Sequence, residues 1–243
     1  MDFNVEVFQS TLVQGLQDWG LTTSEQELRT MVRFAELIIE TNQTLNLTRL
    51  VEPEEMAVKN FLDSLSCLRL ELPDKLSCLD LGTGAGFPGV PLALVRPGWS
   101  MVLLDSLRKR LGFLDKALQE LGLTNCSTLH ARAEDVGQNQ QHRESYDLVV
   151  SRAVASLPVL LELCTPLVKV GGCFVAYKSS EGHAELDKCS KVMKVLGLQV
   201  EQVFHFQLPL SMGERNLLVL RKEVPTPRLY PRRAGLPNKH PLE

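Results

Sequence analysis

The sequence predicts an α/β fold with a mostly parallel sheet, a terminal antiparallel hairpin and an N-terminal helical appendage. From residue 76 onward, apolar runs of strand length alternate with helical stretches, as in a parallel sheet covered by helices on both faces. The first apolar run ends in a glycine-rich loop. The last two runs are joined by a connection too short for a crossover helix, so they should pair antiparallel.

The N-terminal segment, residues 1–72, is expected to be helical. Its apolar residues recur at intervals of three and four, which is typical of amphipathic helices. A proline stands at the expected first turn of the last of these helices, where its missing N–H costs nothing. The spacing predicts helices over residues 3–19, 24–41 and 53–70.

The second segment, residues 73–222, should contain the sheet. Its expected strands are 76–81, 101–104, 126–130, 146–150, 172–177, 198–206 and 216–222. Its expected helices are 90–95, 106–121, 156–168 and 183–196, with a short turn after the third strand.

The tail, residues 223–243, differs from the rest in composition. Residues 221–243 hold six Lys/Arg against two Asp/Glu, and five prolines follow Val224. Such a segment is expected to be extended and not packed on the domain.

Composition limits the class of protein. A chain of 243 residues with 44% hydrophobic and 23% charged residues is ordinary for a globular protein with one sizeable core. We expect it to be cytoplasmic, because no apolar run would span a bilayer and the N-terminus does not resemble a signal peptide. The six cysteines lack C-x-x-C spacing, so neither a metal site nor a disulfide framework is expected. A net charge of −3 argues against a general nucleic-acid binder.

Residues 79–89, Leu-Asp-Leu-Gly-Thr-Gly-Ala-Gly-Phe-Pro-Gly, form the most informative stretch. Glycine lacks a Cβ atom, so this loop can adopt positive φ and let a ligand lie against the main chain, next to a helix N-terminus. Residues 84–89 fit the dinucleotide pattern G-x-G-x-x-G. Residues 80–86 fit [D/E]-x-G-x-G-x-G more completely, the S-adenosylmethionine loop of class I methyltransferases. An ordinary turn without a ligand is the third interpretation. The candidate cofactor residues of the loop are Gly82, Gly84 and Gly86.

Acidic residues follow the second and third expected strands. Asp105 ends the second strand, where a carboxylate in nucleotide-binding sheets meets the ribose hydroxyls. Capping of the next helix is the alternative role for Asp105, and the two roles can coexist. Ala133 and Glu134 follow the third strand, where such a sheet frames the adenine. A solvated helix start is the alternative for Glu134.

The fourth expected strand ends in Ser151-Arg152-Ala153. Strand ends at the switch point of such a sheet face the ligand, so Arg152 should project into the cleft. The chain lacks the [N/D]-P-P-[Y/F] sequence that methyltransferases of exocyclic amines commonly carry here. Arginine stays protonated and is a poor general base, so the methyl acceptor should have a lone pair and no proton to remove, as guanine N7 does. A structural ion pair is the alternative role for Arg152.

Several basic residues could hold RNA. Lys178 ends the fifth strand and Arg215 enters the last, so both should lie on the cleft rim, where cations position phosphates. Lys178 joins Arg152 as a candidate catalytic residue. For Lys109 and Arg110 the alternative is a solvated helix face, and for Arg232 and Arg233 it is an inert basic tail. The candidate RNA-binding residues are Lys59, Lys109, Arg110, Lys178, Arg215, Arg232 and Arg233.

Motifs along nearly the whole chain occur together in one known family. They are Asn46-Leu47-Thr48, Phe61-Leu62-Asp63-Ser64, the loop 80–89, Leu103-Leu104-Asp105-Ser106-Leu107 with Lys109-Arg110, Ser151-Arg152-Ala153, Gly213-Glu214-Arg215 and Tyr230-Pro231-Arg232-Arg233-Ala234-Gly235. With these motifs the chain resembles the RsmG (GidB) family of small-subunit ribosomal RNA methyltransferases. It departs from the family where histidines are common, carrying Asn60 and Asn216 instead.

The resemblance implies an S-adenosylmethionine-dependent enzyme that makes 7-methylguanosine in 16S ribosomal RNA. It implies cofactor contacts by Gly82, Phe87, Ala133, Glu134 and Arg152, of which Phe87 comes from the resemblance alone. The expected partner is the small ribosomal subunit, with no membrane and no obligate protein partner. Two other functions fit parts of the sequence: an NAD-dependent oxidoreductase that uses the same glycine loop, and a non-catalytic RNA-binding protein of ribosome assembly.

Overall fold

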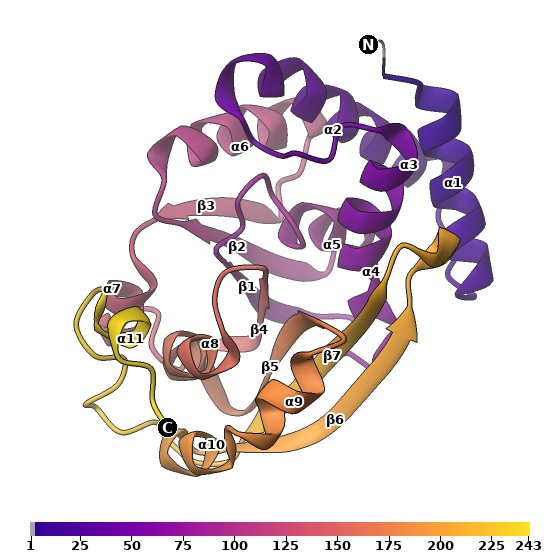
Figure 1. Ribbon diagram of the computed structural model, residues 1–243. Coiled ribbons are helices and arrows are strands. Elements are labelled where there is room, and N and C mark those ends of the chain that lie inside the picture. Colours follow the sequence, from indigo (N-terminus) through magenta and orange to yellow (C-terminus); the bar gives the residue numbers. More distant parts are fainter. Residues whose placement is uncertain (1–2) are drawn as a thin grey trace.

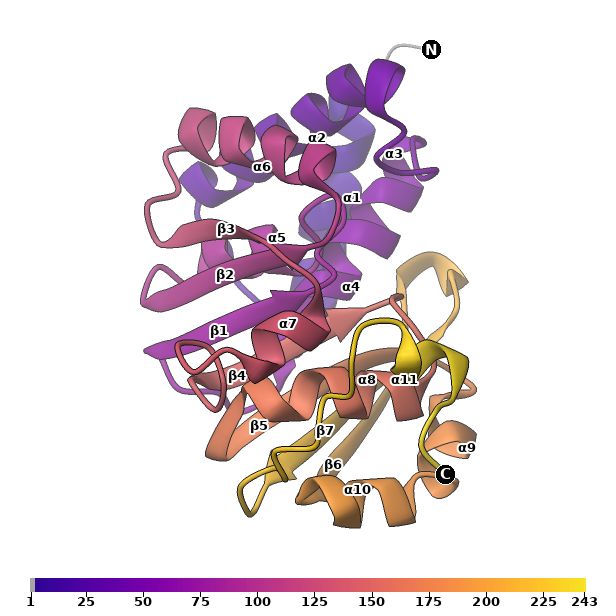
Figure 2. The ribbon, with the colours of Figure 1, turned by 90° about the vertical axis from the view of Figure 1, so that its left-hand side faces the viewer.

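Figures 1 and 2 show the computed structural model, which describes residues 3–243. Its centre is a seven-stranded sheet with the order β3-β2-β1-β4-β5-β7-β6. The strands are β1 (Leu76–Leu81), β2 (Trp99–Asp105), β3 (Cys126–His130), β4 (Tyr146–Arg152), β5 (Val168–Ser179), β6 (Leu198–Gln207) and β7 (Glu214–Lys222). Strands β1 to β5 are parallel, and β7 is antiparallel to both neighbours. The predicted fold class is therefore confirmed.

The order of the strands determines where a ligand can bind. The chain moves outward from β1 through β2 to β3 and then returns to place β4 on the other side of β1. At such a switch point the loops after the two adjacent strands diverge and leave a crevice at the carboxyl edge of the sheet. The glycine loop follows β1 and Arg152 ends β4, so both lie at this crevice.

Helices cover both faces of the sheet (Figure 2). One face carries α1 (Val5–Asp18), α2 (Glu25–Leu45), α5 (Gly89–Val95) and α6 (Arg108–Leu121). The other carries α7 (Ala133–Gln138), α8 (Leu157–Cys164), α9 (Gly182–Asp187) and α10 (Ser190–Leu196). Because helices cover both faces, the central strands β1 and β4 are buried along nearly their whole length. None of the helices described for residues 3–243 is both long and apolar enough to cross a membrane.

The N-terminal helices share a hydrophobic core with the sheet. Phe8 of α1 packs edge-on against Phe61, with ring centroids 5.0 Å apart. Phe61 packs in the same way against Phe87 of the glycine loop, at 5.3 Å, and Phe34 of α2 lies 5.6 Å from Phe87. Aromatic pairs at these distances add to the energy of burial. The N-terminal helices therefore pack against the glycine loop on the side of Phe87.

The expected helix 53–70 is interrupted. It consists of α3 (Pro53–Glu55), a π-helix (Met56–Leu62), α4 (Asp63–Leu65) and a 3₁₀ turn (Ser66–Arg69). In the π-helix the N–H of Asp63 donates to the carbonyls of Val58 and Asn60, and not to that of Lys59. The Lys59 carbonyl instead accepts a hydrogen bond from Arg152, at 2.5 Å. A π-helix often occurs at a functional site, and here it opens the helix toward the cleft.

Two other predicted helices are shorter than expected. The helix expected over 156–168 ends at Cys164 and continues as a 3₁₀ turn, Thr165–Leu167, because Pro166 has no N–H for the helical pattern. The helix expected over 183–196 is divided into α9 and α10.

The prediction of an extended, unpacked tail is wrong. The Arg143 guanidinium donates to the carbonyls of Thr226 (2.7 Å) and Tyr230 (2.8 Å). Arg232 pairs with Glu162 at 2.6 Å, and the tail ends in a short helix, α11 (Leu236–Lys239). Glu162 is fully buried, and a buried carboxylate needs a partner of opposite charge. The tail packs because it supplies this partner.

Candidate active site

A cleft in two parts lies at the carboxyl edges of β1, β2 and β4. The larger cavity has a volume of about 590 Å³ and the smaller one about 320 Å³. Gly82, Arg110 and Ala153 line both cavities, so the two are adjacent. The cleft lies at the switch point of the sheet, where the topology predicts a ligand.

The glycine loop forms the floor of the larger cavity. The N–H groups of Gly82 and Thr83 donate to the carbonyl of Leu104, at 2.8 and 3.1 Å, and tie the loop to β2. Gly84 has a φ of +60°, and among residues 3–243 the atom nearest to a Cβ added there would be the Gly82 carbonyl oxygen, at 3.9 Å. The main chain at Gly84 is thus open to the cavity, as a ligand lying on the backbone requires.

Gly86 has a different role from the one predicted. It is buried and lines neither cavity. A Cβ atom there would lie within 3.0 Å of Val90, Leu114 and Phe34. The expectation that Gly86 contacts the cofactor is therefore not supported, because packing of the loop against its neighbours already requires a glycine at this position.

Asp80 holds the loop from inside the sheet. It is fully buried, and its Oδ2 accepts a hydrogen bond from the N–H of Gly89, at 2.9 Å, at the start of α5. Its other carboxylate oxygen has no hydrogen-bond partner among residues 3–243. Burial raises the pKa of Asp80 from its ordinary value of 3.8 to about 6.

The raised pKa makes stability depend on pH. The native state binds the Asp80 proton more tightly than the unfolded chain, so this contribution is complete below about pH 3.8 and is lost as pH rises through about 6. In Asp80→Asn the Gly89 N–H keeps an acceptor and the titration disappears. We expect the free energy of unfolding of the original chain, relative to the variant, to fall by about 2–3 kcal/mol between pH 4 and 8, as measured by urea unfolding. A difference that does not change with pH would contradict this prediction.

The smaller cavity brings together the predicted nucleoside-binding residues. Asp105, Ala133 and Glu134 all line it. Asp105 is 5% exposed, and its carboxylate accepts hydrogen bonds from the N–H groups of Leu107 (2.8 Å) and Gly84 (3.0 Å). Asp105 therefore fixes both the glycine loop and the residues that precede α6. Its position at the end of β2 is the one predicted for a ribose-binding carboxylate.

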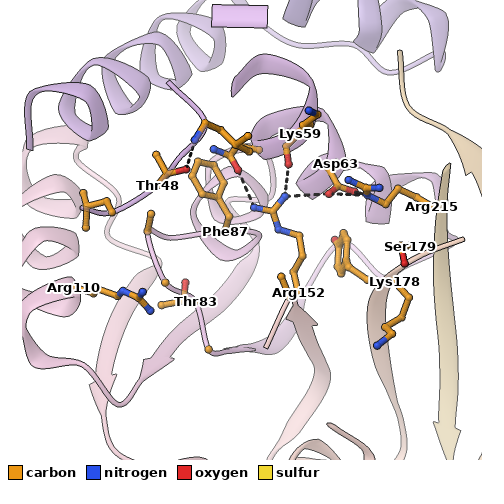
Figure 3. A pocket seen from close by; sticks show the side chains of 18 of the residues that line it. Thr48, Lys59, Asp63, Thr83, Phe87, Arg110, Arg152, Lys178, Ser179 and Arg215 are labelled. Carbon is orange, nitrogen blue, oxygen red and sulfur yellow. Dashed lines mark hydrogen bonds and ion pairs between the residues drawn. The ribbon is translucent and has the colours of Figure 1, made fainter. Parts of the chain in front are cut away.

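Arg152 connects β4 with the N-terminal helices (Figure 3). Its guanidinium donates to the Lys59 carbonyl, to Oδ1 of Asn60 (3.1 Å) and to Oδ2 of Asp63 (3.1 Å). It also lies over the ring of Phe87, 5.4 Å from the centroid. Arg152 lines the larger cavity and also forms an ion pair with Asp63, so its position is compatible with both roles considered from the sequence.

The larger cavity is lined by five basic residues, Lys59, Arg110, Arg152, Lys178 and Arg215. All five were predicted site residues. Lys178 pairs with Glu185 of α9 at 2.8 Å, and this carboxylate also accepts the N–H of Leu157, so Lys178 is held at the rim. Figure 3 shows Arg110 and Lys178 on opposite sides of the cleft.

Sequence reasoning did not assign a role to Asp63 or Asn60. Asp63 is 3% exposed and accepts hydrogen bonds from Arg152 and, at 3.2 Å, from Arg215. Asn60 is 4% exposed and lines the larger cavity, and its Nδ2 has no hydrogen-bond partner in the part of the chain that the structure describes. The available signal was a polar residue on the apolar face of the expected helix 53–70, where a buried group must have a partner.

Three predicted RNA-binding residues lie outside both cavities. Lys109 is exposed on α6, and Arg233 is exposed in the tail. Arg232 is committed to the buried Glu162 through three hydrogen bonds of 2.6–3.1 Å. The prediction that Arg232 binds RNA is corrected, because moving Arg232 away from Glu162 would leave this buried carboxylate without its counter-charge.

Comparisons with known proteins show the family to which the chain belongs. The model of the family GidB, described as rRNA small subunit methyltransferase G, matches residues 27–218. The chain belongs to the GidB family. Ribosomal RNA small subunit methyltransferase G of Desulforamulus reducens is 44% identical over 96% of this chain and 97% of its own length. The protein of the same name from Pelotomaculum thermopropionicum is 44% identical over 98% and 100%.

Solved structures match the fold. A SAM-dependent methyltransferase from Aquifex aeolicus has a TM-score of 0.55 and 15% identity, and the match covers 72% of this chain and 96% of that one. Membership of the GidB family confirms the resemblance expected from the sequence and the enzyme class, an S-adenosylmethionine-dependent methyltransferase. Neither the oxidoreductase nor the non-catalytic alternative is supported.

Proposed function

We propose that this GidB-family chain transfers a methyl group from S-adenosylmethionine to N7 of a guanine in 16S ribosomal RNA. One observation carries the proposal. The uncovered main chain at Gly84 faces the same cavity as Arg152 and the basic rim, so a cofactor and a phosphate-bearing substrate could meet there. The reaction would take place in the cytoplasm, on ribosomal RNA or a small subunit.

The residues present suit the cofactor. Gly84 leaves room along the loop, which a Cβ atom there would fill, and Gly82 lines both cavities. Asp105 and Glu134 in the adjoining cavity are acceptors for hydroxyl and amino groups. When bound, S-adenosylmethionine supplies an electrophilic methyl group on a sulfonium.

The chemistry requires orientation more than proton transfer. Guanine N7 carries a lone pair and no proton, so no general base is needed, and Arg152 would not serve as one. The guanidinium of Arg152 is fixed by three acceptors and can only position the reacting groups. Methyl transfer moves a positive charge onto the purine. Asp63, shared by Arg152 and Arg215, offsets the charge of this wall of the cavity.

The basic rim suits RNA phosphates. Lys59, Lys178 and Arg215 line the larger cavity from the N-terminal helices, β5 and β7. Cations placed in this way hold a backbone without reading its sequence, and binding should weaken steeply as salt rises.

The decisive experiment is transfer of a labelled methyl group to small ribosomal subunits from cells that lack this protein. We expect incorporation into one guanine at N7, and mapping of the modified nucleotide identifies it. Subunits from cells that contain the protein are the matched control and should accept almost no label. Label on an exocyclic amine, or no label in either sample, would contradict the proposal.

A further inference from the structure

The tail forms part of the wall of the smaller cavity. Asn238 of α11 lines this cavity together with Leu107, Ala133 and Glu134. The tail lies beyond residues 27–218, the segment that the family model matches. Figures 1 and 2 both show α11 beside α7 and α8. A segment outside the matched domain thus borders the predicted nucleoside site.

A backbone group of the tail holds Glu134. The N–H of Gly235 donates to Oε1 of Glu134, at 2.8 Å. Glu134 is 7% exposed, and within residues 3–243 no hydrogen bond to its Oε2 is formed. The contact orients a nearly buried carboxylate at the edge of the cavity while its second oxygen stays available as an acceptor.

Several contacts fix the tail in this position. Arg232 forms a bidentate pair with Glu162 of α8, whose side chain is fully buried. Pro231 packs so closely on α7 that a Cβ atom at Gly137 would lie 2.7 Å from it. Breaking a buried, bidentate arginine–carboxylate pair costs much free energy. The pair therefore holds Gly235 and Asn238 in fixed positions beside the cavity.

We propose that residues 234–240 complete the nucleobase part of the cofactor site. Gly235 positions Glu134 so that its free oxygen accepts a hydrogen bond from the exocyclic amino group of adenine, and Asn238 closes the cavity beside it. This inference rests on the proposed use of S-adenosylmethionine. It gives the tail a role in choosing the cofactor.

The test uses two ligands that differ at this amino group. S-adenosylhomocysteine carries the amine, and S-inosylhomocysteine carries a carbonyl oxygen that would face the Glu134 carboxylate unfavourably. The full chain should prefer the adenosyl form by about 10- to 100-fold in isothermal titration, the value of a hydrogen bond to a charged group. A chain ending at Arg233 keeps the Arg232–Glu162 pair but lacks Gly235 and Asn238. In it we expect affinity for S-adenosylhomocysteine to fall about tenfold or more and the preference to fall below about threefold.

Two further variants keep the tail. Lys239→Ala changes an exposed residue of α11 and should leave both affinities unchanged. Glu134→Gln keeps an acceptor for Gly235 and presents an amide N–H₂ to the base, so it should shift the preference toward the inosyl form. If the shortened chain does not fold, this variant still tests the contact between Glu134 and the base.

The outcomes separate this inference from the proposed function. A folded shortened chain with unchanged affinity and preference would overturn the role of the tail, as would an unchanged preference in Glu134→Gln. If the full chain binds neither ligand, the cofactor assignment itself is wrong and the inference falls with it.

Discussion

Gly84→Val should abolish binding of S-adenosylhomocysteine while leaving the chain folded. Gly84 has a φ of +60°, and the described atom nearest to an added Cβ is the Gly82 carbonyl oxygen at 3.9 Å, so the new side chain would occupy the cavity and not the core. A ligand lying against this backbone would collide with the valine methyl groups. We expect an affinity loss of at least about 100-fold, measured by isothermal titration, with unfolding measured on the same sample.

The matched control is Gly20→Val. Gly20, between α1 and α2, has a φ of +67°, and no atom of residues 3–243 lies within 4 Å of a Cβ added there. It therefore carries the same backbone strain at a distance from the cleft. Both variants should lose about 1–2 kcal/mol of stability or somewhat more, because a side chain is unfavourable in the left-handed region. Only Gly84→Val should lose the ligand. Normal affinity in Gly84→Val would contradict the assignment of the loop.

Local sequence signals predicted most of the sheet and the glycine loop. Strand β1 and the loop after it could be predicted because an apolar run is followed by glycines, and each of these features depends only on adjacent residues. The predicted cofactor residues of the second cavity also came from their positions at strand ends, which the topology brings to one edge.

The sequence did not reveal features that depend on distant partners. The tail is proline-rich and basic, yet it packs because Arg143 and Glu162 bind it from 70 or more residues away in the chain. Gly86 matches the ligand-binding pattern, yet its neighbours Leu114 and Phe34 give it a packing role. Composition indicates the conformation that a segment favours in isolation. Here the buried Glu162, elsewhere in the chain, determines where the tail lies.

Arg152→Ala should reduce methyl transfer by at least about 100-fold. The change removes the hydrogen bonds to the Lys59 carbonyl, Asn60 and Asp63 together, so the π-helix and β4 lose their fixed relation across the cavity. A misplacement of about 1 Å between reacting groups can cost this much. Arg152→Lys should be nearly as inactive, because one ammonium group cannot reproduce the planar fork that reaches three acceptors.

A comparison with Arg215→Ala separates the role of Arg152 from support of Asp63. Both arginines bind this buried carboxylate, so each single variant leaves it one partner and should lower the free energy of unfolding by about 1–3 kcal/mol. Arg215→Ala should raise the KM for RNA with kcat largely retained, whereas Arg152→Ala should lose kcat. Arg29→Ala, which removes an exposed arginine of α2 that pairs with Glu25 of the same helix, controls for loss of a surface cation.

The separate changes in kcat and in KM distinguish two possible roles of Arg152. If Arg152 only anchored Asp63, the two arginine variants would lose activity in the same way and in proportion to their loss of stability. If Arg152 positions the reacting groups, kcat falls in Arg152→Ala at temperatures where both variants remain folded. Unchanged turnover in Arg152→Ala would make this arginine a purely structural residue, and the wall opposite the glycine loop would then need another group to orient the base.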